Sequence, residues 1–118
     1  IYTVQAERKE ARVTIEEFID NKAPQLAVYG KAFLSDELDF CEIQLYLWDT
    51  LEEWQQLIPT SEAQTEMETV FWHLLHSFSK WPDWMIRGNK YLCQQLHACC
   101  DFLCLGGQMP SGCIGIRP

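Results

Sequence analysis

The chain contains no lysine or arginine between residues 32 and 79, a stretch of 48 positions that holds ten carboxylates. The segments on either side are neutral (1–31) or carry a balance of +2 (80–118), so this one stretch supplies the whole net charge of −8. Phosphate contacts need clustered basic side chains. We therefore expect no direct contact with nucleic acid, and binding to an acidic membrane surface is disfavoured for the same reason.

Other features are missing too. No apolar run approaches the roughly 20 residues of a membrane span, and no secretory signal is visible, although the chain begins at Ile1. The sequence has no nucleophile elbow, no glycine-rich phosphate loop and no HExxH motif. His73 and His76 lie on an apolar stretch, where a histidine is usually a core or boundary residue. We predict a protein that is not an enzyme and needs no cofactor.

The apolar residues recur at steps of three and four along most of the chain, which is typical of amphipathic helices. At 118 residues the chain fits one domain with a single core. The prediction is therefore an all-α fold, a single-domain bundle (1–118) of four to five helices. The helices occupy residues 14–105, after a short N-terminal strand or extended arm (1–13) and before an irregular C-terminal tail (106–118).

The first two helices are bounded by capping and proline signals. "TIEE" is a capping box with Thr14 as the N-cap, and Pro24 is expected to break or kink the helix before it ends near residue 34. The second helix is expected to start with Ser35 or Asp36 as its cap and to end at Pro59. Its apolar positions form two stripes: Leu38, Cys41, Leu45 and Trp48, and Phe40, Ile43, Leu47, Leu51 and Trp54.

Similar signals bound the later helices. "SEAQ" at 61–64 is a second capping box, and a strongly apolar helix is expected behind it. "WPDW" at 81–84 marks a break and restart, and Gly88-Asn89 a further interruption. The last helix is predicted over residues 90–105, with Gly106-Gly107 as its stop.

Four of the six cysteines and one histidine fall within residues 93–104. Leu92, Leu96, Cys99 and Leu103 form an ordinary core stripe. The neighbouring stripe is Cys93, His97, Cys100 and Cys104. Those four residues span about 16 Å of helix, so they cannot all bind one ion, and the usual zinc spacings are absent.

A metal site on this stripe would need ligands from elsewhere, such as Cys41, Cys113 or His73. The chain also has no Cys-x-x-Cys redox pair. We expect reduced cysteines packed in or near a helical core, in a cytoplasmic protein, with Cys113 the most reactive. A metal or redox sensor built on the second stripe stays as an alternative.

The acidic segment is the main functional signal. Helix surfaces normally mix charges, because opposite charges at i,i+4 stabilise a helix and like charges destabilise it. An unneutralised field can speed the capture of a basic protein. The expected partner-binding residues are Asp36, Glu37, Asp39, Glu42, Asp49, Glu52, Glu53 and Trp54. Glu62, Glu66 and Glu68 form a second row, and a purely solubilising role is the alternative.

In size and charge the chain is similar to small acidic proteins that block a basic surface, such as immunity proteins of nuclease toxins and mimics of DNA. The resemblance is one of composition and carries over no functional residues. The leading hypothesis is a protein-binding inhibitor or immunity protein with a basic, nuclease-like partner. A structural subunit of a larger assembly is a further alternative.

Overall fold

The computed structural model describes residues 14–57, 63–110 and 112–118. Within these residues the fold is all-α, with five helices and no strand, as the sequence predicts: α2 (Ile15–Leu34), α3 (Phe40–Gln55), α4 (Glu66–Lys80), α5 (Asp83–Gly88) and α6 (Lys90–Leu105). The expected N-terminal arm or strand lies outside the described residues.

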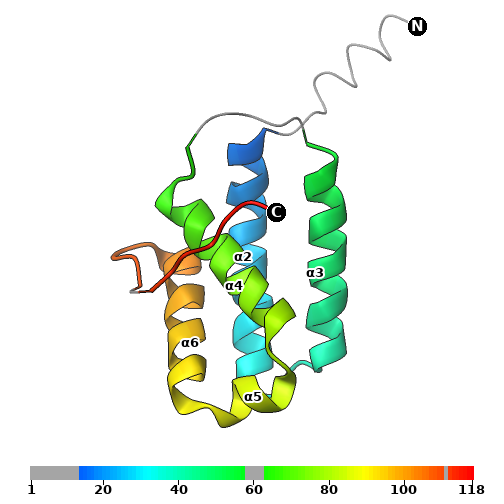
Figure 1. The fold of residues 1–118 in the computed structure, drawn as a ribbon, viewed down its shortest axis with the longest axis vertical. Helices are drawn as coiled ribbons and strands as arrows, with labels where there is room; N and C mark the ends of the chain where they lie inside the picture. Colours follow the sequence, from blue (N-terminus) through cyan, green and yellow to red (C-terminus); the bar gives the residue numbers. More distant parts are fainter. Residues whose placement is uncertain (1–13, 58–62, 111) are drawn as a thin grey trace, which may run out of the picture.

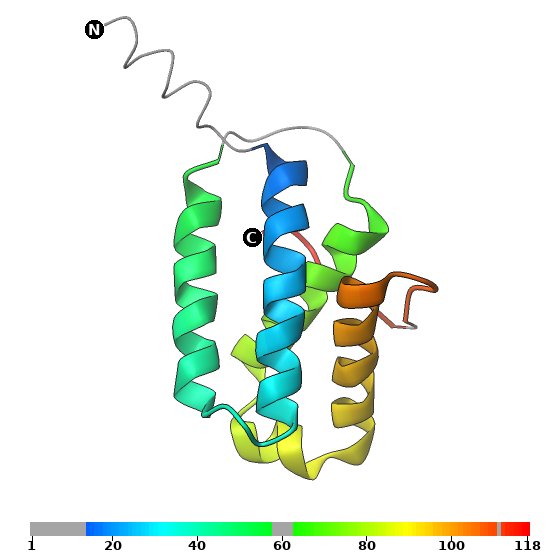
Figure 2. The same cartoon turned by 180° about the vertical axis from the view of Figure 1, so that it is seen from behind.

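Three long helices stand side by side, with α2 in the middle and α3 and α6 on its two flanks (Figures 1 and 2). Helix α4 crosses the face of this row, and the short α5 links it to α6 at one end. The C-terminal tail runs back over the outer side of α4. Helix α4 is therefore covered on both sides, and it contributes more buried residues than any other described helix.

The core is aromatic where α2, α3 and α4 meet. Trp72 is fully buried, and Phe71 and Trp54 meet it edge-on with ring centroids 4.8 Å away. Phe18 of α2 completes the group. Gly30 lets α2 approach α6 and α4, since a Cβ there would lie 2.8 Å from the Sγ atom of Cys100.

The first helix begins as predicted, with the Thr14 hydroxyl accepting a hydrogen bond from the backbone N–H of Glu17 at 3.1 Å. The expected break at Pro24 is wrong, because α2 is one helix from Ile15 to Leu34. Pro24 is exposed, so the carbonyl that loses its helical partner can bond to water. Burial of Ala23, Leu26 and Ala27 beside it offsets the propensity cost of about 3 kcal/mol.

Two helix starts fall later than the capping signals predict. Ser35 is the C-cap of α2, and Asp36 takes a left-handed backbone conformation (φ 63°) in the turn, so α3 begins only after Asp39. The third helix begins after Thr65, whose hydroxyl accepts from the N–H of Glu68 at 3.1 Å. "TEME" at 65–68 has the same capping-box pattern as "SEAQ" and lies nearer to the apolar run.

The end of the chain follows the prediction closely. Helix α4 ends at Lys80, and α5 restarts after Pro82. Asn89 caps α6, whose bounds are the predicted ones, and Gly106 ends the helix at φ 77°.

Candidate functional site

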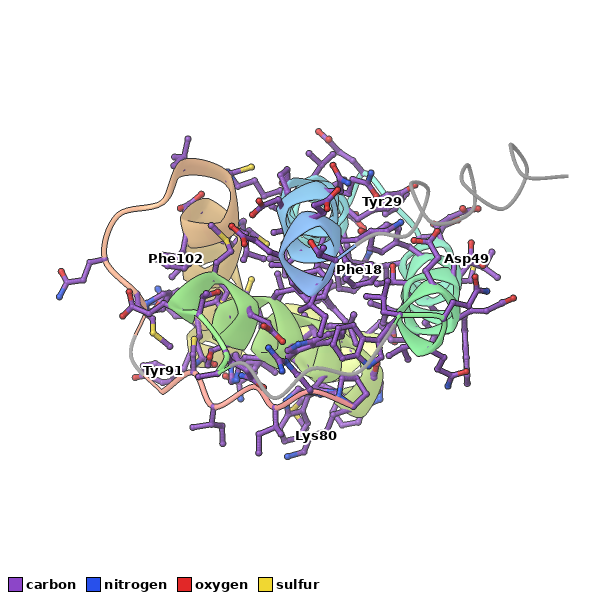
Figure 3. All side chains as sticks on the ribbon, turned by 90° about the horizontal axis from the view of Figure 1, so that it is seen from above. Phe18, Tyr29, Asp49, Lys80, Tyr91 and Phe102 are labelled. Atoms are coloured by element: carbon purple, nitrogen blue, oxygen red, sulfur yellow. The ribbon has the colours of Figure 1, made fainter. Side chains whose placement is uncertain are left out.

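Within the part of the chain that the structure describes, helix α3 packs on its neighbours through one face. That face buries Ile43, Tyr46, Leu47 and Thr50. The Tyr46 hydroxyl donates to the backbone carbonyl of Lys22 on α2 at 3.2 Å, and its ring stacks on Tyr29 at 4.4 Å. Burial raises the pKa of the Tyr46 phenol well above its usual range. Figure 3 shows Tyr29 on the α3 side of α2 and Asp49 on the outer side of α3.

The opposite face of α3 carries an exposed apolar stripe. Leu45 is 59% and Trp48 70% exposed, and Cys41 is exposed as well. Of the two apolar stripes that the sequence shows on this helix, the one with Ile43 and Leu47 lies on the buried face, together with Tyr46 and Thr50. Leu45 and Trp48 lie about one turn apart on the same face, and exposed apolar side chains that are rimmed by polar residues often mark interaction sites.

Carboxylates lie next to this stripe. Glu42, Asp49 and Glu52 are exposed and form no ion pair with any residue that the structure describes. At about 100° per residue, Glu52 falls between Leu45 and Trp48, and Glu42 and Asp49 fall along one edge. Glu37 and Asp39 are exposed in the turn before α3. We name the surface of Cys41, Glu42, Leu45, Trp48, Asp49 and Glu52 the α3 outer face.

The other three residues expected to bind a partner have contacts of their own. Asp36 pairs with Arg87 at 3.2 Å, and Glu53 pairs with Lys22 at 2.6 Å, so basic residues from both ends of the chain neutralise part of the acidic segment. Trp54 is half-buried against Phe18 and Trp72. Trp48 takes the exposed position that sequence reasoning gave to Trp54.

The second acidic row divides in a different way. Glu62 lies outside the described residues, and Glu66 is exposed at the start of α4. Glu68 is only 3% exposed. Its carboxylate accepts hydrogen bonds from the Trp72 indole at 3.0 Å and from both Nε and Nη2 of Arg117 in the tail. Glu68 is therefore a core residue and not part of a binding surface.

The tail residues 112–118 lie along α4 through backbone contacts. The side chain of Gln64 donates to the Gly115 carbonyl and accepts from the Arg117 N–H, both at 2.9 Å. His76 contacts the Ile116 carbonyl at 3.0 Å. A Cβ at Gly115 would overlap the α4 backbone at Thr69 and His73. The tail contains no motif that predicts this contact; Arg117, the one charged residue of 106–118, is its sequence signal.

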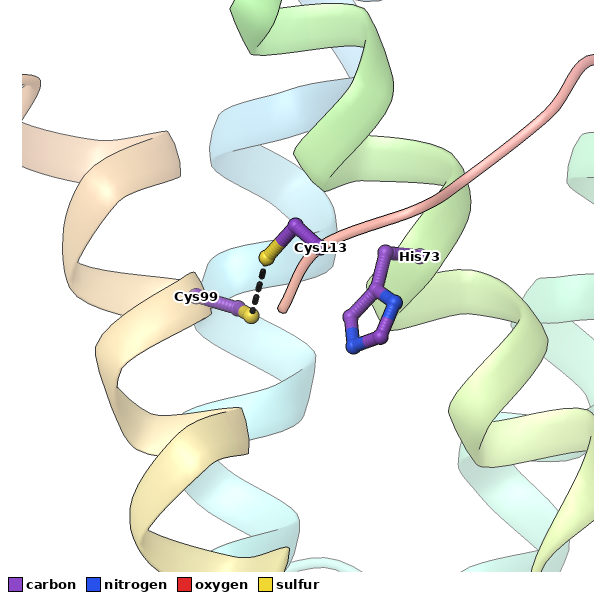
Figure 4. A group of neighbouring side chains, drawn as sticks. All are labelled: His73, Cys99 and Cys113. Carbon is purple, nitrogen blue, oxygen red and sulfur yellow. Dashed lines mark hydrogen bonds between the residues drawn. The ribbon is translucent and has the colours of Figure 1, made fainter. Parts of the chain in front are cut away.

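The four residues of the α6 cysteine stripe, Cys93, His97, Cys100 and Cys104, are not among the described groups whose ligand atoms lie close enough for one ion. Cys93 and His97 are half-buried, Cys100 is buried and Cys104 is exposed, so the four residues face different surroundings. Among the described residues, the group with ligand atoms close enough for one ion is His73, Cys99 and Cys113. It joins α4, α6 and the tail (Figure 4). Sequence reasoning named His73 and Cys113 only as outside ligands for the other stripe.

A shallow, open hollow between α5 and α6 offers little chemistry. Its lining is mainly apolar, and the residues are Trp81, Met85, Asn89, Tyr91, Leu92 and Gln95. It contains no carboxylate, histidine or cysteine. The α3 outer face is the stronger candidate, since it combines exposed apolar surface with charge.

In comparisons with known proteins, no family model, no curated protein and no solved structure matches the chain. No helix among the described residues is long and apolar enough to cross a membrane.

Proposed function

We propose that this chain is a non-enzymatic protein-binding domain and that the α3 outer face is its binding surface. The observation that carries the proposal is the exposure of Leu45 and Trp48 beside Glu42, Asp49 and Glu52. The partner is a basic protein that offers an apolar pocket for Trp48.

The two kinds of residue would contribute differently to binding. Buried tryptophans dominate the energy of many interfaces, and polar residues around them exclude water. Charges around such an anchor chiefly raise the association rate and select partners of the opposite charge. Glu42, Asp49 and Glu52, which pair with no described residue, therefore favour a cationic partner, and Trp48 provides the anchor that holds it.

Inhibition is the most concrete form of this function. A domain that covers a basic, nucleic-acid-binding surface with its own carboxylates would block that surface, as in the immunity proteins and DNA mimics that this chain is similar to in size and charge. If the chain is an inhibitor of this kind, its partner is a nuclease-like toxin.

The test is to capture partners from an extract of the native host at several salt concentrations, using matched variants. Trp48→Ala is compared with Trp84→Ala, because Trp84 on α5 is equally exposed at 67%. The pair Glu42→Lys and Asp49→Lys is compared with Glu16→Lys and Asp20→Lys on α2, which are exposed and change the net charge equally. We expect a basic protein that the α3 variants lose and the control variants retain. Equal capture by all four, or an acidic partner, would contradict the proposal.

A further inference from the structure

One imidazole and two thiols from distant parts of the sequence meet between α4, α6 and the tail. The Sγ atoms of Cys99 and Cys113 lie 3.7 Å apart, and a ring nitrogen of His73 lies within 4.8 Å of both sulfurs. Figure 4 shows the imidazole on the side of α4 that faces the two sulfurs. Cys99 is buried and Cys113 is partly buried.

His73 supplies an independent indication of a ligand. Its Nε2 atom is buried and has no hydrogen-bond partner, although buried polar atoms are nearly always bonded. Its Nδ1 atom accepts a long hydrogen bond of 3.4 Å from the backbone N–H of Ile114. The ring is thus held on its Nδ1 side by the tail, while its Nε2 side lacks a partner.

The 3.7 Å separation of the sulfurs is that of a hydrogen bond between two thiols, and it also matches the spacing of two thiolates on one metal ion. Two thiolates that bind one tetrahedral zinc ion at ~2.3 Å lie ~3.8 Å apart. A disulfide requires the sulfurs to approach to ~2.05 Å. The imidazole would have to move inward by about 1 Å to reach the zinc–nitrogen distance.

We propose that His73, Cys99 and Cys113 form a metal site for a thiophilic cation, with Zn²⁺ as the occupant. Thiolate and imidazole are the ligands that zinc prefers. Three protein ligands leave a fourth position for water or an added ligand. Both thiols lose their protons on binding.

Metal binding would fasten the C-terminal tail at its start. Gln64, His76 and Glu68 already hold residues 115–117 on α4. The metal would add a bond at residue 113 and connect the tail to α6 as well. Binding through Nε2 places the ring proton on Nδ1, so the N–H of Ile114 has to turn away from His73.

The experiment is a zinc titration of the full 118-residue chain against a chromophoric chelator, with a phosphine reductant that keeps the cysteines reduced. Co²⁺ is titrated in parallel, since thiolate ligands give it sulfur-to-cobalt charge-transfer bands and a tetrahedral site gives strong visible bands. The variants are Cys99→Ala, Cys113→Ala and His73→Gln. Cys104→Ala is the matched control, because it removes an exposed cysteine of the same helix. Circular dichroism confirms that each variant is folded.

We expect one equivalent of Zn²⁺, cobalt bands with sulfur character, and affinity weakened on the order of 100-fold or more in Cys99→Ala and Cys113→Ala, since even outer-shell losses cost 10–100-fold. Cys104→Ala should bind as the unmodified chain does. The amide resonance of Ile114 should shift on zinc addition in Cys104→Ala and stay in place in Cys113→Ala. Failure of the unmodified chain to bind zinc, or binding that survives the loss of Cys113, overturns the proposal.

Discussion

The α3 outer face and the tail contact on α4 use carboxylates from the same acidic segment in opposite ways. Glu42, Asp49 and Glu52 point to solvent without an ion pair to any described residue. Glu68 is buried, and Arg117 meets its carboxylate with two nitrogens. Carboxylates of one segment thus lie in solvent in one region and form part of the core in the other. What separates them is whether the fold brings a cation from elsewhere in the sequence.

Three basic residues from outside the acidic segment form ion pairs with its carboxylates. Lys22 reaches Glu53, Arg87 reaches Asp36, and Arg117 reaches Glu68. Among the described residues, these pairs leave Glu42, Asp49 and Glu52 as the carboxylates of α3 without an ion pair. Fewer carboxylates of the acidic segment are therefore unneutralised than the charge pattern alone indicates, and those on α3 lie beside exposed apolar side chains.

The largest effect is expected where the tail contact is broken at Arg117. Arg117→Met leaves the Glu68 carboxylate buried, with the Trp72 indole as its remaining side-chain donor among the described residues. Removing one partner of a buried ion pair typically costs about 3–5 kcal/mol, so we expect a loss of about 3 kcal/mol in the free energy of unfolding, measured by urea denaturation. Glu68→Gln should cost less, because Arg117 is partly exposed and can turn to water.

A double substitution separates the ion pair from general disruption. Replacing Glu68 and Arg117 together with leucine removes both charges, and well-packed apolar residues often match a buried pair in stability. The double variant should therefore be more stable than Arg117→Met. If Arg117→Met unfolds with the free energy of the unmodified chain, the tail does not contribute to the core.

A smaller effect is expected at Gly115. An added Cβ meets the α4 backbone at Thr69 and His73, which cannot give way as a flexible side chain can. Gly115→Ala should therefore lift the tail and cost about 1–3 kcal/mol in the free energy of unfolding. Limited proteolysis should then cut the tail faster.

Gly112 is the matched control for Gly115, with a different mechanism. Its φ of 80° makes alanine unfavourable there, but the nearest atom is the flexible side chain of Gln95. Gly112→Ala should strain the backbone and leave residues 115–117 in place. Equal protection from proteolysis in Gly115→Ala and the unmodified chain would show that the tail does not lie flat on α4.

Local signals in the sequence were sufficient for most of the fold. Asn89, Gly106 and Thr14 act through their immediate neighbours, so the bounds of α6 and the start of α2 could be read directly. The helix break predicted at Pro24 is wrong because the packing of α2 outweighs the unfavourable helix propensity of proline. The helix starts predicted from Ser35 and from the capping box at 61–64 are too early, because Asp39 and Thr65 are the N-caps of α3 and α4.

The candidate sites could not be predicted from local sequence patterns, because they depend on how the helices and the tail pack. Either apolar stripe of α3 could have faced the core, and only the packing of α2 and α4 decided that Trp48 stays outside. The group of His73, Cys99 and Cys113 joins residues up to 40 positions apart through the path of the tail. Periodicity found Cys99 on its core stripe but could not bring Cys113 to it.

The smallest effect on stability is expected on the α3 outer face. Surface substitutions away from caps and buried contacts usually change stability by no more than about 0.5 kcal/mol, and both Trp48→Ala and the pair Glu42→Lys and Asp49→Lys should fall within that range. Trp54→Ala, on the same helix but packed against Phe18 and Trp72, is the control that should be strongly destabilising. If Trp48→Ala destabilised the domain as much as Trp54→Ala, Trp48 would belong to the core, and the contrast between the two regions would fail. Neutrality in stability together with loss of partner capture is the result that only a binding surface can give.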